Sequence, residues 1–189
     1  MRVDCVILAA GLSSRMGRNK MLLEVGGKTV IERCIDTFYE SCSRIIVVTG
    51  KYHEDIKKCL IRYSKVHLEY NSDYPQGMFS SVKTGIRDVE SERFFLTPGD
   101  YPLLKADTIN QMIDKNGQFV VPVYHGQQGH PILLDKLFIP VILDSTLTSL
   151  RDCLESSSPE KQELYVDDNG IITDMDTIEE YMAILKRFR

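Results

Sequence analysis

The amino-acid sequence predicts a single α/β domain in which helices cover both faces of a mostly parallel sheet. Short β-rich runs that end at Gly or Pro turns alternate along the chain with segments whose apolar residues recur at helical spacing. Strand, helix and strand repeated in this order is typical of a three-layer α/β/α, Rossmann-like fold. The length of 189 residues suits one domain with one core.

Five β-rich runs are predicted to be strands, and four segments with helical periodicity are predicted to be helices. The strands cover residues 3–9, 44–49, 66–70, 93–97 and 119–123, and the helices cover residues 29–39, 54–61, 79–86 and 108–115. In open α/β sheets, ligands bind beyond the carboxyl ends of the strands. We therefore expect the functional residues in the loops that follow strands.

The alternation of predicted strands and helices ends after residue 123. The stretch 126–129 (GQQG) separates two short extended pieces, which predicts a small β-hairpin excursion from the main sheet. A final helix is predicted within residues 174–188, because Thr177 and Glu180 have capping-box spacing. The apolar stripe of this helix is formed by Tyr181, Ile184, Leu185 and Phe188.

Composition excludes several classes of protein. Hydrophobic residues make up 43% of the chain but form no apolar run of the ~18 positions that a membrane span needs. The net charge of −4 would repel a polyanion, so we expect no nucleic-acid partner. Five scattered cysteines without a CxxC pair indicate reduced thiols, and Asp4 argues against a signal peptide. We expect a monomeric, cytoplasmic protein that has no membrane partner.

A glycine loop rich in cations follows the first predicted strand. Residues 7–20 read ILAAGLSSRMGRNK. Glycine lets backbone N–H groups approach an anion, Arg15 can form two hydrogen bonds to phosphate oxygens, and Lys20 adds a point charge. The pattern predicts phosphate binding. The alternative is a solvated surface loop whose cations pair with nearby acids.

Spacing excludes two better-known nucleotide loops. Gly11 and Gly17 are six positions apart, which is incompatible with the dinucleotide motif GxGxxG. The residues 27–29 (GKT) end like a P-loop, but Leu22 stands where that motif requires its first glycine. The loop is therefore a phosphate-binding candidate of a different kind.

Acidic residues in two places are candidate metal ligands. Asp100 lies in a proline-bounded turn after the predicted strand 93–97, and Mg²⁺ usually takes one or two protein carboxylates. Asp174 and Asp176 are two positions apart in an extended lead-in to the last helix, so both can face Asp100. The alternative for Asp100 is that it caps a turn or the next helix. The alternative for Asp174 and Asp176 is that they only interact favourably with the dipole at the N-terminus of the last helix.

A polar loop at residues 71–81 enters the third predicted helix. Gly77 permits close approach of a ligand, and Ser80 and Ser81 offer hydroxyl groups. An ordinary capped helix start has the same composition. The loop is therefore a candidate ligand-binding segment with a structural alternative.

His130 and Tyr101 are candidates for contact with a second substrate. His130 lies between a glycine and a proline, where histidine is as often a turn residue as a ligand. Tyr101 follows Asp100 directly and can stack on a ring, as Tyr124 can, although aromatic residues are commoner in cores.

Together these motifs resemble a known family. LAAGxSxRMGxxK, as it stands at residues 8–20, resembles the signature of the MobA-like nucleotidyltransferases, and within them of the molybdenum cofactor cytidylyltransferases. The similarity continues in order at residues 71–81 (NSDYPQGMFSS), 98–102 (PGDYP), 126–131 (GQQGHP) and 174–177 (DMDT). It extends over almost the whole chain.

The resemblance implies a nucleotide-diphospho-sugar transferase-like fold and a role for each motif. Arg15, Lys20 and Asp100 would be catalytic, Asp100 and Asp176 would hold Mg²⁺, and Tyr101 and His130 would bind the acceptor. The nucleotide would contact Arg15 and Lys20 together with Leu8, Ala9, Ala10, Gly11, Ser13, Asn71, Gly77, Ser80, Ser81, Pro98 and Gly99. In the single domain 1–189, residues 1–123 would form the nucleotide-binding half, and residues 124–189 the acceptor-binding half with the C-terminal helix.

The reaction implied is Mg²⁺-dependent transfer of CMP from CTP to the phosphate of molybdopterin, with release of pyrophosphate. LAAG, with alanine at position 10 in place of a second glycine, resembles the cytidylyl branch rather than the guanylyl branch. A molybdenum hydroxylase or its chaperone is implied as a partner that receives the product.

One stretch departs from the pattern. Relatives usually carry Gly-Asp-x-Gly-Ala-Arg before the penultimate helix, whereas residues 144–151 read DSTLTSLR, without glycine. The identity of the acceptor therefore stays open. The alternatives are a GTP-using molybdopterin guanylyltransferase, a sugar- or alditol-phosphate nucleotidyltransferase, and a non-catalytic nucleotide-binding accessory protein for molybdoenzyme maturation.

Overall fold

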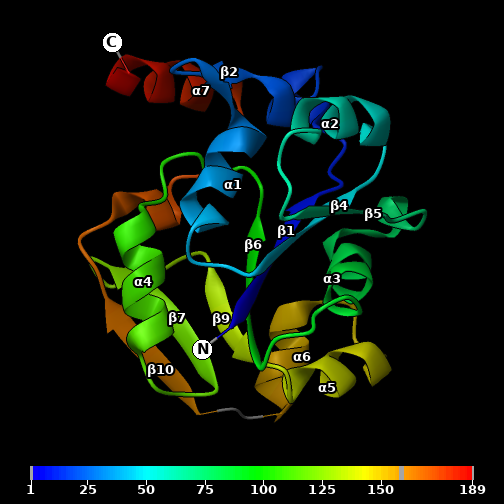
Figure 1. Ribbon diagram of the computed structural model, residues 1–189, viewed down its shortest axis with the longest axis vertical. Coiled ribbons are helices and arrows are strands. Elements are labelled where there is room, and N and C mark those ends of the chain that lie inside the picture. Colours follow the sequence, from blue (N-terminus) through cyan, green and yellow to red (C-terminus); the bar gives the residue numbers. More distant parts are fainter. Residues whose placement is uncertain (1, 158–159, 189) are drawn as a thin grey trace.

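Figure 1 shows the computed structural model of the protein, which describes residues 2–157 and 160–188. The main sheet has the strand order β10-β7-β9-β6-β1-β4-β5, with β8 paired to β7. Its strands are β1 (Val3–Ala9), β4 (Arg44–Thr49), β5 (Val66–Tyr70), β6 (Arg93–Pro98), β7 (Phe119–Tyr124), β8 (Gln127–Gln128), β9 (Ile132–Asp135) and β10 (Lys161–Tyr165). The five predicted strands are confirmed.

Strand β1 forms the centre of the sheet. All seven of its residues are buried, and it pairs in parallel with β4 on one side and β6 on the other. Cys5 and Ile7 point into one apolar cluster, whereas Val6 and Leu8 point into another on the opposite face. A strand buried on both faces needs this nearly continuous apolar run, and the sequence of β1 supplies it.

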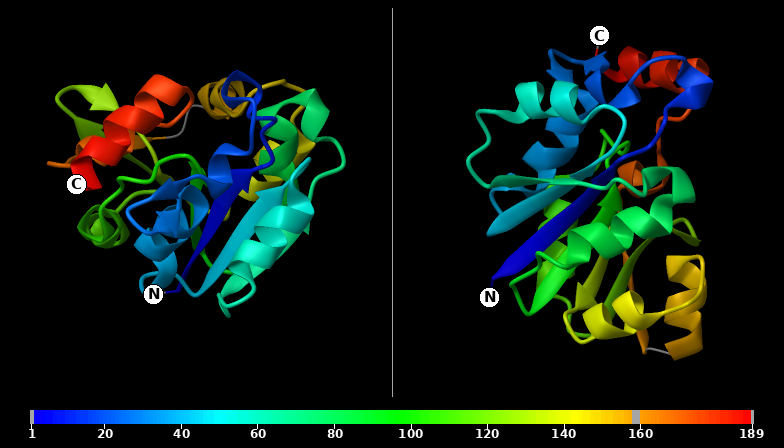
Figure 2. Two further views of the ribbon diagram at one scale, coloured as in Figure 1. Left: turned by 90° about the horizontal axis from the view of Figure 1, so that it is seen from above. Right: turned by 90° about the vertical axis from the view of Figure 1, so that its right-hand side faces the viewer.

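Helices cover both faces of the sheet, which confirms the three-layer α/β/α prediction (Figure 2). One apolar cluster contains residues of α1 (Val30–Tyr39), α2 (His53–Leu60) and α4 (Ala106–Asp114). The other contains residues of α3 (Met78–Ile86), α5 (Phe138–Asp144) and α6 (Leu150–Ser157). Among the described residues no helix is long and apolar enough to cross a membrane.

The predicted hairpin is built into the main sheet, which corrects its description as an excursion. Its turn lies at residues 125–126, so that β8 pairs antiparallel with β7 through Gln128 and Val123. The chain then returns as β9, an antiparallel strand between β6 and β7. Leu133 and Leu134 of β9 are fully buried, and this burial holds the strand inside the sheet.

The last helix packs beside the glycine loop. Figures 1 and 2 both show α7 (Ile178–Leu185) next to the short ribbon of β2 (Glu24–Val25) and β3 (Lys28–Thr29), at the end of the molecule away from α5 and α6. A third apolar cluster joins Met16 of the loop to Met175 and Ile184. The predicted capping box is present, because Thr177 Oγ1 accepts from the Glu180 N–H and the Glu180 carboxylate accepts from the Thr177 N–H.

Helix α3 lies close to the sheet because Gly85 has no side chain. A Cβ at this position would stand 2.5 Å from Cγ1 of Val6 and 2.6 Å from Cγ2 of Val48. Both valines are buried in the central strands, so neither has room to move away. The close approach fixes the position of α3, whose N-terminus borders the candidate site.

We predict that Gly85→Ala lowers the free energy of unfolding by about 1–3 kcal/mol, because overpacking outweighs the gain in helix propensity of about 1 kcal/mol. Urea denaturation measures the change. Arg87→Ala, at the exposed C-cap of the same helix, is the matched control and should change stability by no more than about 0.5 kcal/mol. Equal unfolding midpoints for the Gly85→Ala variant and the wild type would contradict the packing argument.

Candidate active site

The glycine loop leaves the carboxyl end of β1 and folds back over the sheet edge. Two short 3-10 turns, Ser14–Met16 and Lys20–Leu22, give the loop its shape. Ser13 and Gly17 have φ values of 51° and 65°, in the left-handed region. The Lys20 N–H donates to Ser13 Oγ at 3.2 Å, which closes the loop on itself. Arg15 therefore points outward, with its side chain 68% exposed, whereas the Lys20 side chain is only 10% exposed.

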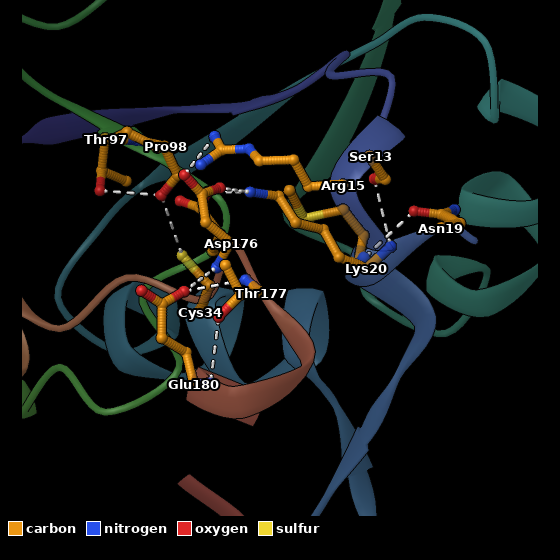
Figure 3. A network of polar contacts seen from close by, with 12 residues as sticks. Ser13, Arg15, Asn19, Lys20, Cys34, Thr97, Pro98, Asp176, Thr177 and Glu180 are labelled. Carbon is orange, nitrogen blue, oxygen red and sulfur yellow. Dashed lines mark hydrogen bonds and ion pairs between the residues drawn. The ribbon is translucent and has the colours of Figure 1, made fainter. Parts of the chain in front are cut away.

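Arg15 and Lys20 converge on two carboxylates from distant parts of the chain (Figure 3). The Lys20 ammonium donates directly to Asp100 Oδ2 and, at 2.6 Å, to Asp176 Oδ1. Arg15 donates to the other oxygen of Asp176, also at 2.6 Å. The predicted catalytic and metal-binding residues are thus brought together in one ionic network.

The fold explains why these two acids meet. Asp100 follows β6, and the Gly99 N–H donates to Leu8 O at 2.9 Å, which ties the end of β6 to the end of β1. Asp176 precedes α7, and its N–H donates to the Glu180 carboxylate at 2.7 Å. The residues Leu8, Ala9, Ala10, Gly11, Pro98 and Gly99 all lie on these two adjoining strand ends, as expected for parallel neighbours.

The network shifts the pKa values of its members. The hydrogen bond from Lys20 lowers the pKa of the Asp176 carboxyl, with a further contribution from Arg15. Burial works against the charged ammonium of Lys20, but Asp100 and Asp176 outweigh it and raise the lysine pKa. Asp174 behaves differently, because burial and the nearby Asp100 carboxylate raise its pKa. Asp174 therefore lies within electrostatic reach of Asp100 and Asp176.

The residues present fit a hard divalent cation. Asp100 Oδ1 is buried and has no hydrogen-bond partner among the described residues, so one oxygen of this acid is left for another ligand. The site offers carboxylate oxygens, which Mg²⁺ and Mn²⁺ prefer, and burial raises the pKa of the neighbouring Cys34 thiol. In the part of the chain that the structure describes there is no group of three or more metal-ligating side chains. A site with two protein carboxylates is what Mg²⁺ commonly uses with a phosphate substrate.

The loop after β5 forms a rigid second wall. The Asn71 side chain is 2% exposed and donates to the hydroxyls of Ser80 and Ser81 at 2.9 and 3.0 Å. Gly77, at the N-cap of α3, has a φ of 108° that favours glycine. These polar side chains form hydrogen bonds with one another, and in this structure those bonds fix the shape of the loop. Their role as nucleotide ligands stays a prediction.

A cleft of about 1010 Å³ extends from the ends of β1 and β6 across the face covered by α3 and α6. Leu8, Pro98, Tyr101 and His130 line one end. The floor is apolar and includes Val82, Leu96, Phe119, Val121 and Ile132. Sequence reasoning found the near end of this cleft. It missed Gln128, Arg151 and Lys161 at the other end, because nothing in the sequence indicated that β8, α6 and β10 meet there.

His130 is held rigidly beside Tyr101. Its N–H donates to Ile171 O at 2.8 Å, and a Cβ on Gly129 would stand 2.2 Å from the same carbonyl oxygen. The rings of His130 and Tyr101 meet edge to face with centroids 5.3 Å apart. Burial lowers the pKa of His130 despite the nearby Asp100, and its Nδ1 has no partner among the described residues. His130 therefore presents this buried ring nitrogen in the wall of the cleft.

Comparison with known proteins identifies the family of the chain. The MobA-like NTP transferase domain matches residues 5–161. The chain belongs to the MobA-like NTP transferase family, and it is a nucleotidyltransferase. It is 34% identical over 188 residues to the molybdenum cofactor cytidylyltransferase of Escherichia coli K12, covering 98% of this chain and 97% of that protein. It is also 28% identical over 133 residues to a probable molybdenum cofactor guanylyltransferase of Bacillus cytotoxicus, covering 68% and 65% of the two chains.

Solved structures support the same fold. The crystal structure of Rv0371c from Mycobacterium tuberculosis H37Rv superposes with a TM-score of 0.84 at 22% identity and covers 98% of each chain. The same protein in complex with manganese superposes with a TM-score of 0.79 at 21% identity. The family-level prediction and the Rossmann-like fold are therefore confirmed.

We predict that Lys20→Met lowers the free energy of unfolding at pH 7 by about 2–4 kcal/mol, because two largely buried carboxylates lose their shared cation. The folded-state pKa of Asp176 is depressed. Its contribution is therefore present above the ordinary carboxyl pKa of 3.8 and is lost as the pH falls through the lower folded-state value. Urea denaturation at pH 7 and at several pH values below 3.8 measures the free energy of unfolding of both proteins. The difference between wild type and Lys20→Met should become smaller as the pH falls.

Lys28→Met is the control for this experiment. Lys28 pairs with Asp36 at the surface, and its side chain is 52% exposed. Its removal should cost no more than about 1 kcal/mol. A Lys20→Met variant as stable as Lys28→Met would show that the network contributes little to the fold.

Proposed function

We propose that this nucleotidyltransferase transfers CMP from CTP to the phosphate of molybdopterin and releases pyrophosphate. The observation that carries the proposal is the convergence of Arg15, Lys20, Asp100 and Asp176 in one ionic network, in which Asp100 directly precedes Tyr101 of the cleft wall. The 34% identity over nearly the full length with a molybdenum cofactor cytidylyltransferase supports the choice of substrates.

In this proposal the protein acts by positioning and charge neutralisation. Arg15 and Lys20 bind the triphosphate oxygens, and Asp100 and Asp176 hold Mg²⁺. Bound there, Mg²⁺ would supply the positive charge that stabilises the triphosphate as its α-phosphorus is attacked. The phosphate of the acceptor is itself the nucleophile, so the chain needs no covalent intermediate. Tyr101 and His130 orient the acceptor.

The strand ends and the β5 loop would surround the cytosine. Ala9, Ala10 and Gly11 present backbone groups at the carboxyl end of β1, next to Gly99. Alanine at position 10, in place of a second glycine, resembles the cytidylyl branch of the family. This resemblance supports cytosine over guanine. The relatives named as guanylyltransferases make GTP the first alternative substrate.

The cleft favours an extended acceptor with a planar, partly apolar body. Its floor is apolar, and its far end contains Arg151 and Lys161. Arg151 is exposed, and its guanidinium has no hydrogen-bond or ion-pair partner among the described residues. A guanidinium in this position can bind oxygen atoms at the far side of a ring system. We propose that the departure at residues 144–151 keeps this contact while altering the loop around it.

We predict that Asp100→Ala reduces CTP-dependent pyrophosphate release in the presence of molybdopterin by at least about 10²–10³-fold, because the central carboxylate of the site is lost. Asp107→Ala is the matched control, since Asp107 is an exposed acid in the first turn of the next helix, and it should keep wild-type turnover. Circular dichroism checks that both variants are folded. Near-normal turnover by folded Asp100→Ala would refute the assigned role.

Arg151→Gln should raise the Michaelis constant for molybdopterin about tenfold and leave that for CTP unchanged, because a charged hydrogen bond at the far end of the cleft is lost. Arg87→Gln replaces an exposed arginine of α3 that does not line the cleft, and it should change neither constant. Steady-state kinetics with each substrate varied in turn gives both values. If the Michaelis constant for CTP changed instead, Arg151 would be a residue of the nucleotide site and not of the acceptor site.

A further inference from the structure

The ammonium group of Lys20 occupies the position between the two proposed metal ligands. It contacts Asp100 Oδ2 directly and lies 2.6 Å from Asp176 Oδ1. The side chains of Lys20 and Asp100 are only 10% and 13% exposed, so water competes weakly for these contacts. In this structure Lys20 therefore supplies the positive charge that balances the two carboxylates.

A divalent cation and this lysine cannot use the same oxygens at once. Mg²⁺ binds carboxylate oxygens at about 2.0–2.1 Å, so an ion bridging Asp100 and Asp176 would overlap the observed position of the Lys20 nitrogen. The two like charges would also repel each other strongly in a site so little exposed to solvent. An ion that used Asp100 Oδ2 and Asp176 Oδ1 could bind only after Lys20 had moved.

The triphosphate is the ligand that can draw Lys20 away. The Lys20 backbone is fixed by its bond to Ser13, but its side chain is a flexible four-carbon stem. Arg15 is tied to Asp176 in the same manner and already faces solvent. Phosphate oxygens arriving in the glycine loop offer both cations new partners, which frees the carboxylates of Asp100 and Asp176.

We propose that Lys20 is a placeholder cation that makes divalent metal binding depend on prior or simultaneous binding of the nucleotide. The proposal rests on the proposed function, because it uses the same site and the same nucleotide. Metal and nucleotide then raise each other's affinity by one common factor, as linkage requires. The carboxylates would not be filled by free Mg²⁺ before substrate arrives.

The test measures Mn²⁺ binding to the nucleotide-free protein by electron paramagnetic resonance. We expect weak binding by the wild type and at least tenfold tighter binding by Lys20→Met, since the methionine fills similar space without the charge. Lys28→Met, which removes a lysine from a distant surface ion pair, should bind Mn²⁺ like the wild type. The double variant Lys20→Met/Asp100→Asn should lose the gain. Equal affinity of wild type and Lys20→Met, or a gain that survives Asp100→Asn, would overturn the proposal.

A second measurement uses only the wild-type protein, so it holds even if Lys20→Met fails to fold. Thermal unfolding is followed with Mg²⁺ alone, with CTP and EDTA, and with CTP and Mg²⁺ together. We expect no shift in melting temperature with Mg²⁺ alone, a shift with CTP and EDTA, and a larger one with both. A shift with Mg²⁺ alone as large as that with both ligands would overturn the proposal. Neither measurement involves an acceptor or turnover, so failure of the proposed reaction would be distinguishable.

Discussion

The contact of Lys20 with Asp100 and Asp176 is the interaction on which the site depends. It joins the loop after the first strand, the turn after β6 and the segment before the last helix. Each partner stands on an element fixed for other reasons: the pairing of β1 with β6, the capping box of α7, and the apolar cluster around Met16 and Ile184. The charges meet because the elements that carry them are each held in place by these other contacts.

The central part of the sheet explains why the active residues come from loops far apart in the sequence. Strands β6, β1, β4 and β5 are parallel, so their carboxyl ends share one edge. The antiparallel strand β9 breaks this pattern and turns the chain back at His130, where it closes the near end of the cleft. The proposed phosphate site at the strand ends and the proposed acceptor site over the sheet face are therefore adjacent.

Sequence reasoning reached the parts of the fold that local patterns determine. Three local patterns were enough for a prediction, because none depends on distant residues. They are the apolar run of β1, the capping box of Thr177 and the cations of the glycine loop. Sequence reasoning did not reach contacts made only by tertiary packing. Two examples are the position of β9 inside the sheet and the lining of one cleft by both Arg151 of α6 and Lys161 of β10. The ion pairs of Lys20 with Asp100 and Asp176 likewise depend on tertiary structure.

The central claim is that this site transfers CMP to molybdopterin. Family membership establishes a nucleotidyltransferase, and the choice of nucleotide and acceptor is what one measurement can decide most directly. The purified protein is incubated with molybdopterin, Mg²⁺ and equal concentrations of CTP and GTP, and the products are identified by mass spectrometry. The account predicts the cytosine dinucleotide of molybdopterin and pyrophosphate in equal amounts. A guanine dinucleotide as the main product, or no dinucleotide at all, would contradict it.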